Sequence, residues 1–199
     1  MEKLILFHGN TESAINEIIN SGNIPEKFIS KGDTYFLGDG FYFYNDSIQA
    51  KVWAKMKVSR NTKYIGQNWA VLKCEMFYNE ELFLDLDKRE EQNFFFDEMV
   101  RLNDQILAKD LEIEEYNDAY LCNHLTNRLD LEILTKTFVY KDKHKTLPTL
   151  FSNKKNSPYS ITRHFRTEKQ YAIKQDKLII SFEKIESGKS VKKGRGEAN

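Results

Sequence analysis

The segment LGDGFYFY, residues 37–44, places a Gly-x-Gly turn directly before a run of four aromatic residues. Glycine allows the backbone conformations that a tight turn requires, and aromatic residues favour the extended chain of a β-strand. We therefore predict a turn at 38–40 followed by a strand over Phe41–Tyr44. Many hairpins begin in this way, so this segment alone is weak evidence for any function.

Two further segments combine a strand with polar side chains. The stretch LFHGN, residues 6–10, completes an apolar N-terminal run, which predicts a strand over Lys3–His8 that ends in a turn. The stretch EKQYAI, residues 168–173, predicts a strand near the other end of the chain. A lone His at a strand end is usually structural, and the second stretch alone is no more than an edge strand with one polar face.

In this order and at these separations, the three segments resemble the ADP-ribosyltransferase superfamily, in the diphtheria-toxin-like branch that includes poly(ADP-ribose) polymerases. Strands of the type His-Gly-Ser/Thr, Gly-x-Gly-hydrophobic-Tyr-Phe and Glu/Gln-Tyr-x-Ile/Val line the NAD groove of that branch. The corresponding segments here are HGN (8–10), GDGFYF (38–43) and QYAI (170–173). The resemblance implies an α+β fold in which two small antiparallel sheets surround an NAD cleft, with a helical insertion. Residues 84–160 match only loosely, to bacterial toxin members that carry a helical insert there.

The resemblance also implies roles for individual residues. His8 would hold a ribose hydroxyl, and Tyr42 and Trp53 would sandwich the nicotinamide ring, a geometry that aromatic stacking favours. Gly9 has no side chain, so its backbone could pair closely with the carboxamide. Gln170 would accept a hydrogen bond from the ribose 2′-hydroxyl and stabilise the developing charge. The alternative for Trp53 is a core aromatic residue on an amphipathic helix.

Two positions depart from the family pattern. The best-known members carry Glu where this chain has Gln170, and an amide accepts a hydrogen bond but takes no proton at neutral pH. This departure favours transfer of a single ADP-ribose over polymer elongation. Some relatives carry a Ser that grips the carboxamide where this chain has Ala50, so NAD binding is weaker or Asn10 compensates.

Glu168 is expected to lie beside Gln170, because residues i and i+2 of a strand share one face. Toxin relatives carry a Glu/Gln-x-Glu pair there, so we hypothesise that Glu168 orients or deprotonates the incoming nucleophile. The alternative is an exposed Glu paired with Lys169 or Arg166. Arg163 would meet the pyrophosphate of NAD or an acceptor phosphate, and the alternative is an exposed basic loop that binds no ligand.

Net charge is zero, but charge is unevenly distributed. Residues 75–118 hold 15 acidic side chains against 4 basic ones, and residues 136–170 hold 9 basic against 2 acidic. Basic residues interleaved with aromatic ones suit single-stranded nucleic acid as the acceptor, although a protein acceptor and plain NAD hydrolysis stay open. The acidic stretch could dock a basic antitoxin or chaperone, or it is a solvent-exposed helix face.

The 199 residues fit one domain. We predict an ADP-ribosyltransferase domain over 1–186, with a helical insertion at about 87–136, a basic loop at about 140–160, and a disordered basic tail over 187–199. Within the insertion, helices are expected over Lys88–Lys109 and Asp118–Leu134. Two cysteines without CxxC spacing predict reduced core thiols and no metal site. No segment is typical of a membrane span or a signal peptide, so we expect a cytoplasmic protein.

The sequence therefore predicts an NAD-dependent mono-ADP-ribosyltransferase with NAD as co-substrate. Small intracellular members of this group include toxins of toxin–antitoxin and phage-defence systems, some of which modify nucleic acids, one of them mRNA, and others proteins. An RNA 2′-phosphotransferase shares the fold, but it would need a denser set of phosphate-binding Arg and His. A catalytically inactive fold that only binds NAD or a partner is the other alternative.

Overall fold

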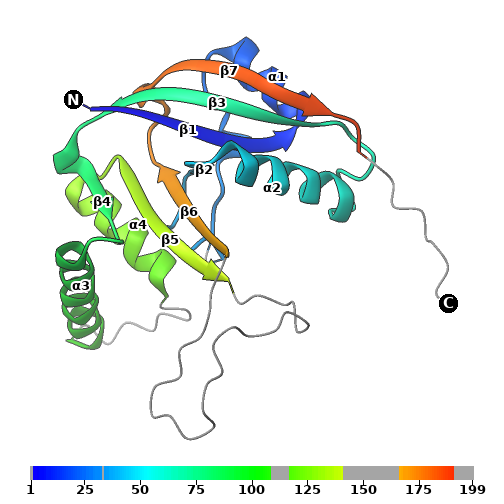
Figure 1. Ribbon diagram of the computed structural model, residues 1–199. Helices are drawn as coiled ribbons and strands as arrows, with labels where there is room; N and C mark the ends of the chain where they lie inside the picture. The colour runs from blue at the N-terminus through cyan, green and yellow to red at the C-terminus, as the bar shows by residue number, and fades with distance from the viewer. Residues whose placement is uncertain (1, 33, 109–116, 141–165, 191–199) are drawn as a thin grey trace, which may run out of the picture.

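The computed structural model describes residues 2–32, 34–108, 117–140 and 166–190. It is an α+β fold in which seven strands form one mixed sheet in the order β4-β5-β6-β2-β1-β3-β7 (Figure 1). The strands are β1 (Glu2–Thr11), β2 (Phe41–Tyr44), β3 (Trp69–Tyr78), β4 (Phe83–Asp85), β5 (Ile133–Tyr140), β6 (Arg166–Ile173) and β7 (Ile179–Gly188). The α-helices of the described residues are α1 (Glu12–Ser21), α2 (Ser47–Arg60), α3 (Arg89–Ala108) and α4 (Asp118–Leu129).

The sheet is narrow at one place, the junction between β1 and β2. These strands share a single residue pair, Phe7 with Tyr44, whereas β1 pairs with β3 from Glu2 to Thr11. The other residues of β2, Phe41–Phe43, pair with β6 and not with β1. The prediction of two small antiparallel sheets is therefore corrected to one continuous sheet, and it is mixed because β4 and β5 run parallel.

Helix α1 follows β1 without a loop. Thr11 caps it by accepting a hydrogen bond from the N–H of Ala14, and Gly22 ends it in the left-handed conformation, with φ 66°. Such a conformation favours glycine over residues with a side chain. Ile15 and Ile18 are fully buried in the core beside β1 and β3, so one face of α1 is apolar and packs on the sheet.

Helix α2 lies directly on β1. Asp46 caps it through a 2.8 Å hydrogen bond from the N–H of Ile48, and Ala50 and Ala54 bury the face that packs on the sheet. A Cβ added at Gly9 would lie 1.9 Å from the carbonyl oxygen of Ala50. Only glycine at position 9 therefore lets α2 approach the sheet this closely.

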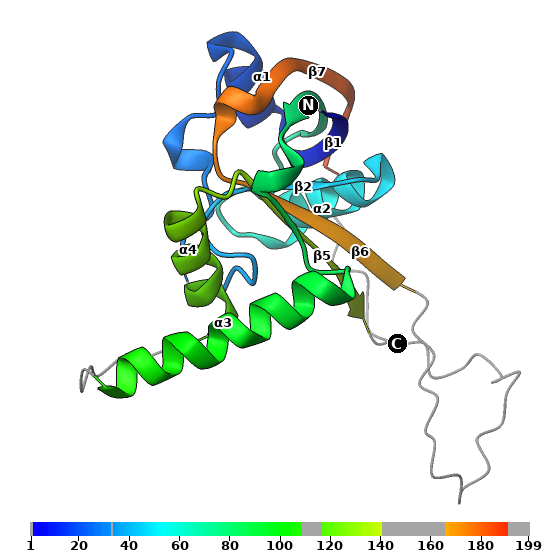
Figure 2. The same cartoon turned by 90° about the vertical axis from the view of Figure 1, so that its left-hand side faces the viewer.

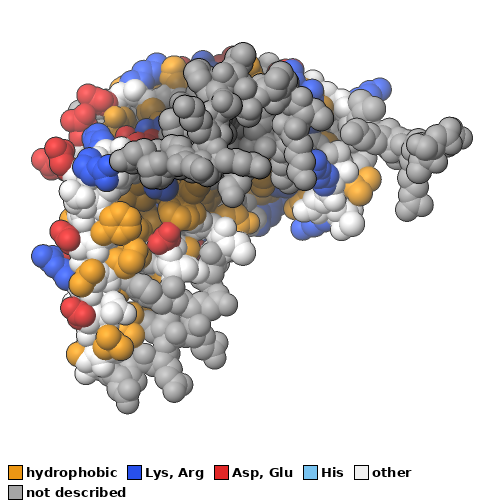
Figure 3. Space-filling view, turned by 60° about the horizontal axis from the view of Figure 1, so that its bottom comes forward, with side chains coloured by type: hydrophobic (Ala, Val, Ile, Leu, Met, Phe, Trp, Pro, Cys, Tyr) orange, Lys and Arg blue, Asp and Glu red, His pale blue; other side chains and the backbone are white. Residues whose placement is uncertain are grey.

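Helices α3 and α4 pack with β4 and β5 at the opposite end of the molecule from α1 and β7 (Figure 2). Glu98 of α3 is buried and forms ion pairs with Arg101, at 2.8 Å, and with Arg128 of α4. The outer side of α3 leaves Phe96 and Val100 exposed, and Figure 3 shows hydrophobic side chains at this end of the molecule.

The predicted helix over Asp118–Leu134 is too long. Helix α4 ends at Leu129 because Asp130 adopts the left-handed conformation, with φ 53°. The chain then forms β5, which pairs with β6 along its whole length. The helical insertion consequently ends before β5, not at residue 136.

Strand β7 also extends further than expected, to Gly188, so the first residues of the predicted tail belong to the sheet. The predicted basic loop lies almost entirely outside the described residues, as do positions 191–199. Cys74 and Cys122 are free and buried, which confirms two core thiols. Across the described ranges, no helix has both the length and the apolar character needed to cross a bilayer.

Candidate functional site

A cleft of about 790 Å³ opens beside the narrow junction of the sheet. Side chains from β1, β2 and β6 line it, together with parts of α1, α2 and the segment 27–36. The residues singled out in the sequence that line it are His8, Asn10, Tyr42, Trp53 and Gln170. Residues from distant parts of the chain therefore share one cavity, whose volume is that of a typical ligand site.

His8 is partly buried and has partners at both ring nitrogens. Its Nδ1 donates to the carbonyl oxygen of Tyr42 at 2.7 Å, and the Asn10 amide donates to its Nε2 at 3.2 Å. The ring also lies against Phe41, with centroids 4.2 Å apart. Burial lowers the pKa of His8 to about 4, while the hydrogen bond to Tyr42 opposes this shift and the charge of Lys57 adds to it. His8 is thus neutral at pH 7, with Nε2 as a hydrogen-bond acceptor.

Tyr42 contributes an aromatic wall. Its hydroxyl donates to the carbonyl oxygen of Gly38 at 2.7 Å, and its ring centroid lies 5.5 Å from that of Tyr35. Burial raises the pKa of Tyr42, so the phenol stays protonated and is no general base. The ring can serve as a flat surface for a planar ligand.

Trp53 lies on the side of α2 that borders the cleft. It is 42% exposed, which makes the alternative of a core aromatic residue wrong, since Ala50 and Ala54 bury the sheet-facing side of the helix. Gln49, Trp53 and Lys57 follow one another at intervals of four residues and so share one face of α2. Sequence reasoning missed Gln49 and Lys57, although this spacing could have revealed both once Trp53 was chosen.

Glu168 and Gln170 share one face of β6, as predicted. The Gln170 amide donates to a carboxylate oxygen of Glu168 at 3.5 Å, and the amide of Gln49 donates to the other oxygen. Glu168 does not itself line the cleft but lies beside Gln170, which does. Two neutral amides therefore hold this carboxylate at the edge of the cleft.

The alternative partner Lys169 points elsewhere. Its ammonium pairs with Asp85 at 3.2 Å and with Asp87 at 3.0 Å, so the proposed pairing of Glu168 with Lys169 is wrong. Among the described side chains, no cation forms an ion pair with Glu168. The side chain of Arg166, the other suggested partner, lies outside that set.

Gly9 has another role than the predicted ligand contact, and Arg163 cannot be placed at the cleft. Gly9 is buried under Ala50 and is not among the residues that line the cleft, so its observed role is to admit α2. Arg163 falls outside the described residues. Asn10 lines the cleft, and its Oδ1 accepts a 2.8 Å hydrogen bond from the N–H of Thr11, which fixes the amide that donates to His8.

The turn before β2 is held by groups that sequence reasoning missed. The ammonium of Lys174 donates to the carbonyl oxygens of Leu37, at 2.7 Å, and of Asp39. Asn123 of α4 accepts a 2.7 Å hydrogen bond from the N–H of Asp39. Burial lowers the pKa of Lys174 to about 8. No local signal marks these residues, because their partners lie more than 80 positions away.

Comparison with known proteins places few limits on function. No family model matches the chain, and no solved structure matches it. The chain is similar to an uncharacterized protein of Methanocaldococcus jannaschii, with 26% identity over 200 residues that span 96% of this chain and 91% of the relative. The likeness thus extends over nearly the whole of both chains, and the relative's description names no activity.

Proposed function

We propose that the chain is an NAD-dependent mono-ADP-ribosyltransferase of the bacterial toxin or defence type. It would release nicotinamide and transfer ADP-ribose to a macromolecule, with nucleic acid favoured over protein. The observation that carries the proposal is that His8, Tyr42 and Gln170 line one cleft of about 790 Å³ although they come from three separate strands. A chance likeness of three short segments would give no reason for such convergence.

The groups around the cleft suit the two ends of a dinucleotide. Tyr42 and Trp53 offer aromatic surfaces for the nicotinamide ring. A ribose hydroxyl would replace the Asn10 amide as the donor to Nε2 of neutral His8, because this nitrogen has a single lone pair. The amide nitrogen of Gln170 faces Glu168, which leaves its carbonyl oxygen to accept the hydroxyl of the second ribose. NAD would be consumed as a substrate.

In the proposed reaction, the bond between the ribose anomeric carbon and the nicotinamide nitrogen breaks, and nicotinamide leaves with the bonding electron pair. The ribose then develops positive charge, which a fixed hydrogen bond from its hydroxyl to Gln170 stabilises. A lone pair of the acceptor forms the new bond to the anomeric carbon. The proton released by the acceptor passes to the Glu168 carboxylate, which accepts a hydrogen bond from Gln170.

The preference for nucleic acid comes from acceptor chemistry and sequence. An exocyclic base amine needs little help from a general base, which agrees with an amide at position 170. The sequence over 136–170 interleaves basic residues with aromatic ones, a composition that suits phosphates and bases. A protein acceptor is the competing outcome, and the assay below separates the two.

The direct test is to incubate the purified protein with NAD and quantify free nicotinamide by chromatography. Gln170→Ala should lower the rate at least tenfold, because the fixed acceptor for the ribose hydroxyl is lost. The matched control is Gln105→Ala, which changes an exposed Gln on α3. Absence of both nicotinamide release and NAD binding in the wild-type protein would refute the proposal.

A second arm identifies the acceptor. Radiolabelled NAD is added to a cell lysate, and the labelled product is treated with RNase, DNase or protease. Loss of label after nuclease treatment supports a nucleic acid, and loss after protease supports a protein. Release of nicotinamide only when 2′-phosphorylated RNA is supplied would instead favour the RNA 2′-phosphotransferase alternative.

A further inference from the structure

Two lysines, Lys57 and Lys63, lie at one end of the cleft. Lys57 belongs to the last turn of α2 and Lys63 follows the helix, and both line the cleft. Their ammonium groups lie 4.9 Å and 5.4 Å from the centroid of the Tyr64 ring. Among the described residues, neither lysine forms an ion pair with a carboxylate.

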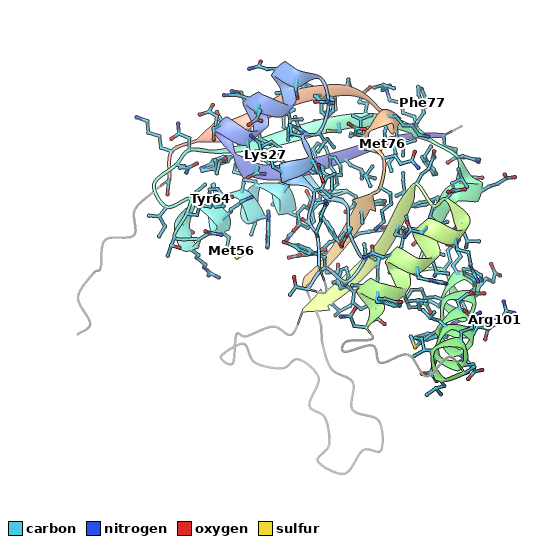
Figure 4. All side chains as sticks on the ribbon, turned by 180° about the vertical axis from the view of Figure 1, so that it is seen from behind. Lys27, Met56, Tyr64, Met76, Phe77 and Arg101 are labelled. Carbon is cyan, nitrogen blue, oxygen red and sulfur yellow. The ribbon has the colours of Figure 1, made fainter. Side chains whose placement is uncertain are left out.

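The other cleft lysines differ. Lys27 pairs with Glu17 at 2.5 Å, and Lys31 pairs with Glu26 at 2.8 Å. Figure 4 shows Lys27 and Tyr64 at the same end of the molecule, where α1 and α2 lie. Within the described part of the chain, the cleft lysines that no carboxylate pairs with are Lys57 and Lys63, and both lie around Tyr64.

The positive charge of these two lysines changes the pKa of neighbouring groups in the cleft. Burial and the neighbouring charge of Lys63 lower the pKa of Lys57, and the charge of Lys57 in turn lowers the pKa of His8. Two ammonium groups held near one another repel, and an anion between them would remove that repulsion. The helix dipole favours basic residues in the last turn of α2, but it does not account for Lys63, which lies beyond the helix.

The position of Lys57 also fits the placement of a dinucleotide. Lys57 lies one helical turn after Trp53 on the same face of α2, a rise of about 6 Å along the axis. This is comparable to the reach of one ribose between a nicotinamide ring and its phosphate. A ligand whose ring packs on Trp53 would thus bring its phosphate to Lys57.

We propose that Lys57 and Lys63, held against Tyr64, form a phosphate-binding site that takes the pyrophosphate of a nucleotide bound in the cleft. The identification of this nucleotide as NAD rests on the function proposed above, whereas the chemistry of the site depends only on the pyrophosphate. In this proposal, α2 and the turn that follows it bind the pyrophosphate, which is the role that the sequence suggested for Arg163.

The test measures ligand binding without catalysis. Isothermal titration calorimetry compares ADP-ribose, inorganic pyrophosphate and adenosine on wild-type protein, Lys57→Gln and Lys63→Gln. Each variant should bind ADP-ribose and pyrophosphate about tenfold more weakly, because each removes a charge-assisted hydrogen bond to phosphate. Adenosine, which has no phosphate, should bind all proteins equally.

Two controls separate charge from folding. Lys55→Gln removes a lysine of the same helix that lies over Trp69 and does not line the cleft, and it should bind ADP-ribose as the wild type does. Lys57→Arg keeps the charge and should retain most of the affinity. Raising the salt concentration should weaken ADP-ribose binding to the wild type more than to Lys57→Gln.

The outcomes separate this site from the proposed reaction. If NAD is not cleaved but pyrophosphate binds in a manner that requires Lys57, the site stands and the transferase fails. If NAD is cleaved while Lys57→Gln and Lys63→Gln bind ADP-ribose like the wild type, the site is wrong. If these variants weaken only a 5′-phosphorylated oligonucleotide acceptor, the phosphate belongs to the acceptor, which contradicts the dinucleotide assignment. Wild-type protein that binds neither ADP-ribose nor pyrophosphate overturns the site outright.

Discussion

The imidazole of His8 donates a 2.7 Å hydrogen bond to the carbonyl oxygen of Tyr42, across the narrow junction between β1 and β2. At this junction the two strands share only the pair of Phe7 with Tyr44. His8 therefore ties together the two parts of the sheet and also lines the cleft beside them. The bond requires Nδ1 to carry the proton, which leaves Nε2 as an acceptor.

The first prediction concerns acid stability. The pKa of His8 is lowered in the folded protein to about 4, from 6.5 for an unperturbed His. Between these values the unfolded chain binds more protons than the folded one, so stability is lost as pH falls from 6.5 to 4. We expect the His8 contribution to this loss to be about 2–3 kcal/mol, measured by urea unfolding at each pH.

The variant His8→Asn should flatten this part of the pH profile, because it keeps a donor near the Tyr42 carbonyl and removes the titrating ring. Asn127→Ala, an exposed position on α4 outside the cleft, removes no titrating group and is the control that should keep the wild-type slope. Equal slopes for wild type and His8→Asn would show that His8 titrates normally.

The second prediction separates the roles of Glu168 and Gln170. Glu168→Gln keeps the side-chain shape but removes the carboxylate, so transfer to the acceptor should fall at least tenfold while NAD hydrolysis is retained. The ratio of labelled acceptor to free nicotinamide measures this split. Glu183→Gln, an exposed position on β7, should leave the ratio unchanged, and unchanged transfer in Glu168→Gln would exclude it as the acceptor-side carboxylate.

The third prediction tests the approach of α2 to the sheet. In Gly9→Ala the added Cβ would meet the Ala50 carbonyl oxygen at 1.9 Å, so the helix backbone must move. We expect a loss of about 3 kcal/mol or more in the free energy of unfolding. Nicotinamide release should fall as well, because Trp53 is carried on the same helix. Thermal unfolding by circular dichroism provides the measurement, and a loss below 1 kcal/mol would mean that the helix accommodates the methyl group.

The fourth prediction concerns the turn that precedes β2. Lys174→Met leaves the carbonyl oxygens of Leu37 and Asp39 without their donor, while it also removes a buried charge whose pKa burial has lowered to about 8. The net loss of stability should be about 1–2 kcal/mol. Because Tyr42 follows this turn and its hydroxyl donates to the carbonyl oxygen of Gly38 within it, the KM for NAD should rise more than kcat falls.

Lys177→Met supplies the control for this experiment, since Lys177 is exposed and lies 3.8 Å from its partner Glu132. It should change neither stability nor KM appreciably. A KM for NAD that stays at the wild-type value in Lys174→Met would separate the turn from the ligand site.

Local sequence was sufficient for the elements near the motifs. Thr11 and Asp46 cap α1 and α2 with their own side chains, a local signal that the sequence carries by itself. The aromatic run Phe41–Tyr44 and the stretch around Gln170 form strands as expected, because their preference for an extended chain needs no distant partner. The same local reasoning placed Glu168 beside Gln170.

Only the tertiary structure decided how these elements combine. The segment that became β5 was predicted partly as helix because its apolar residues fit either period, and pairing with β4 and β6 selects the strand. The single sheet joins strands that are far apart in the chain. So do the hydrogen bonds of Gln49 to Glu168 and of Lys174 to the carbonyl oxygen of Leu37. Hydrogen bonds between such positions leave no periodic pattern in the sequence, so only the tertiary structure shows which residues form them.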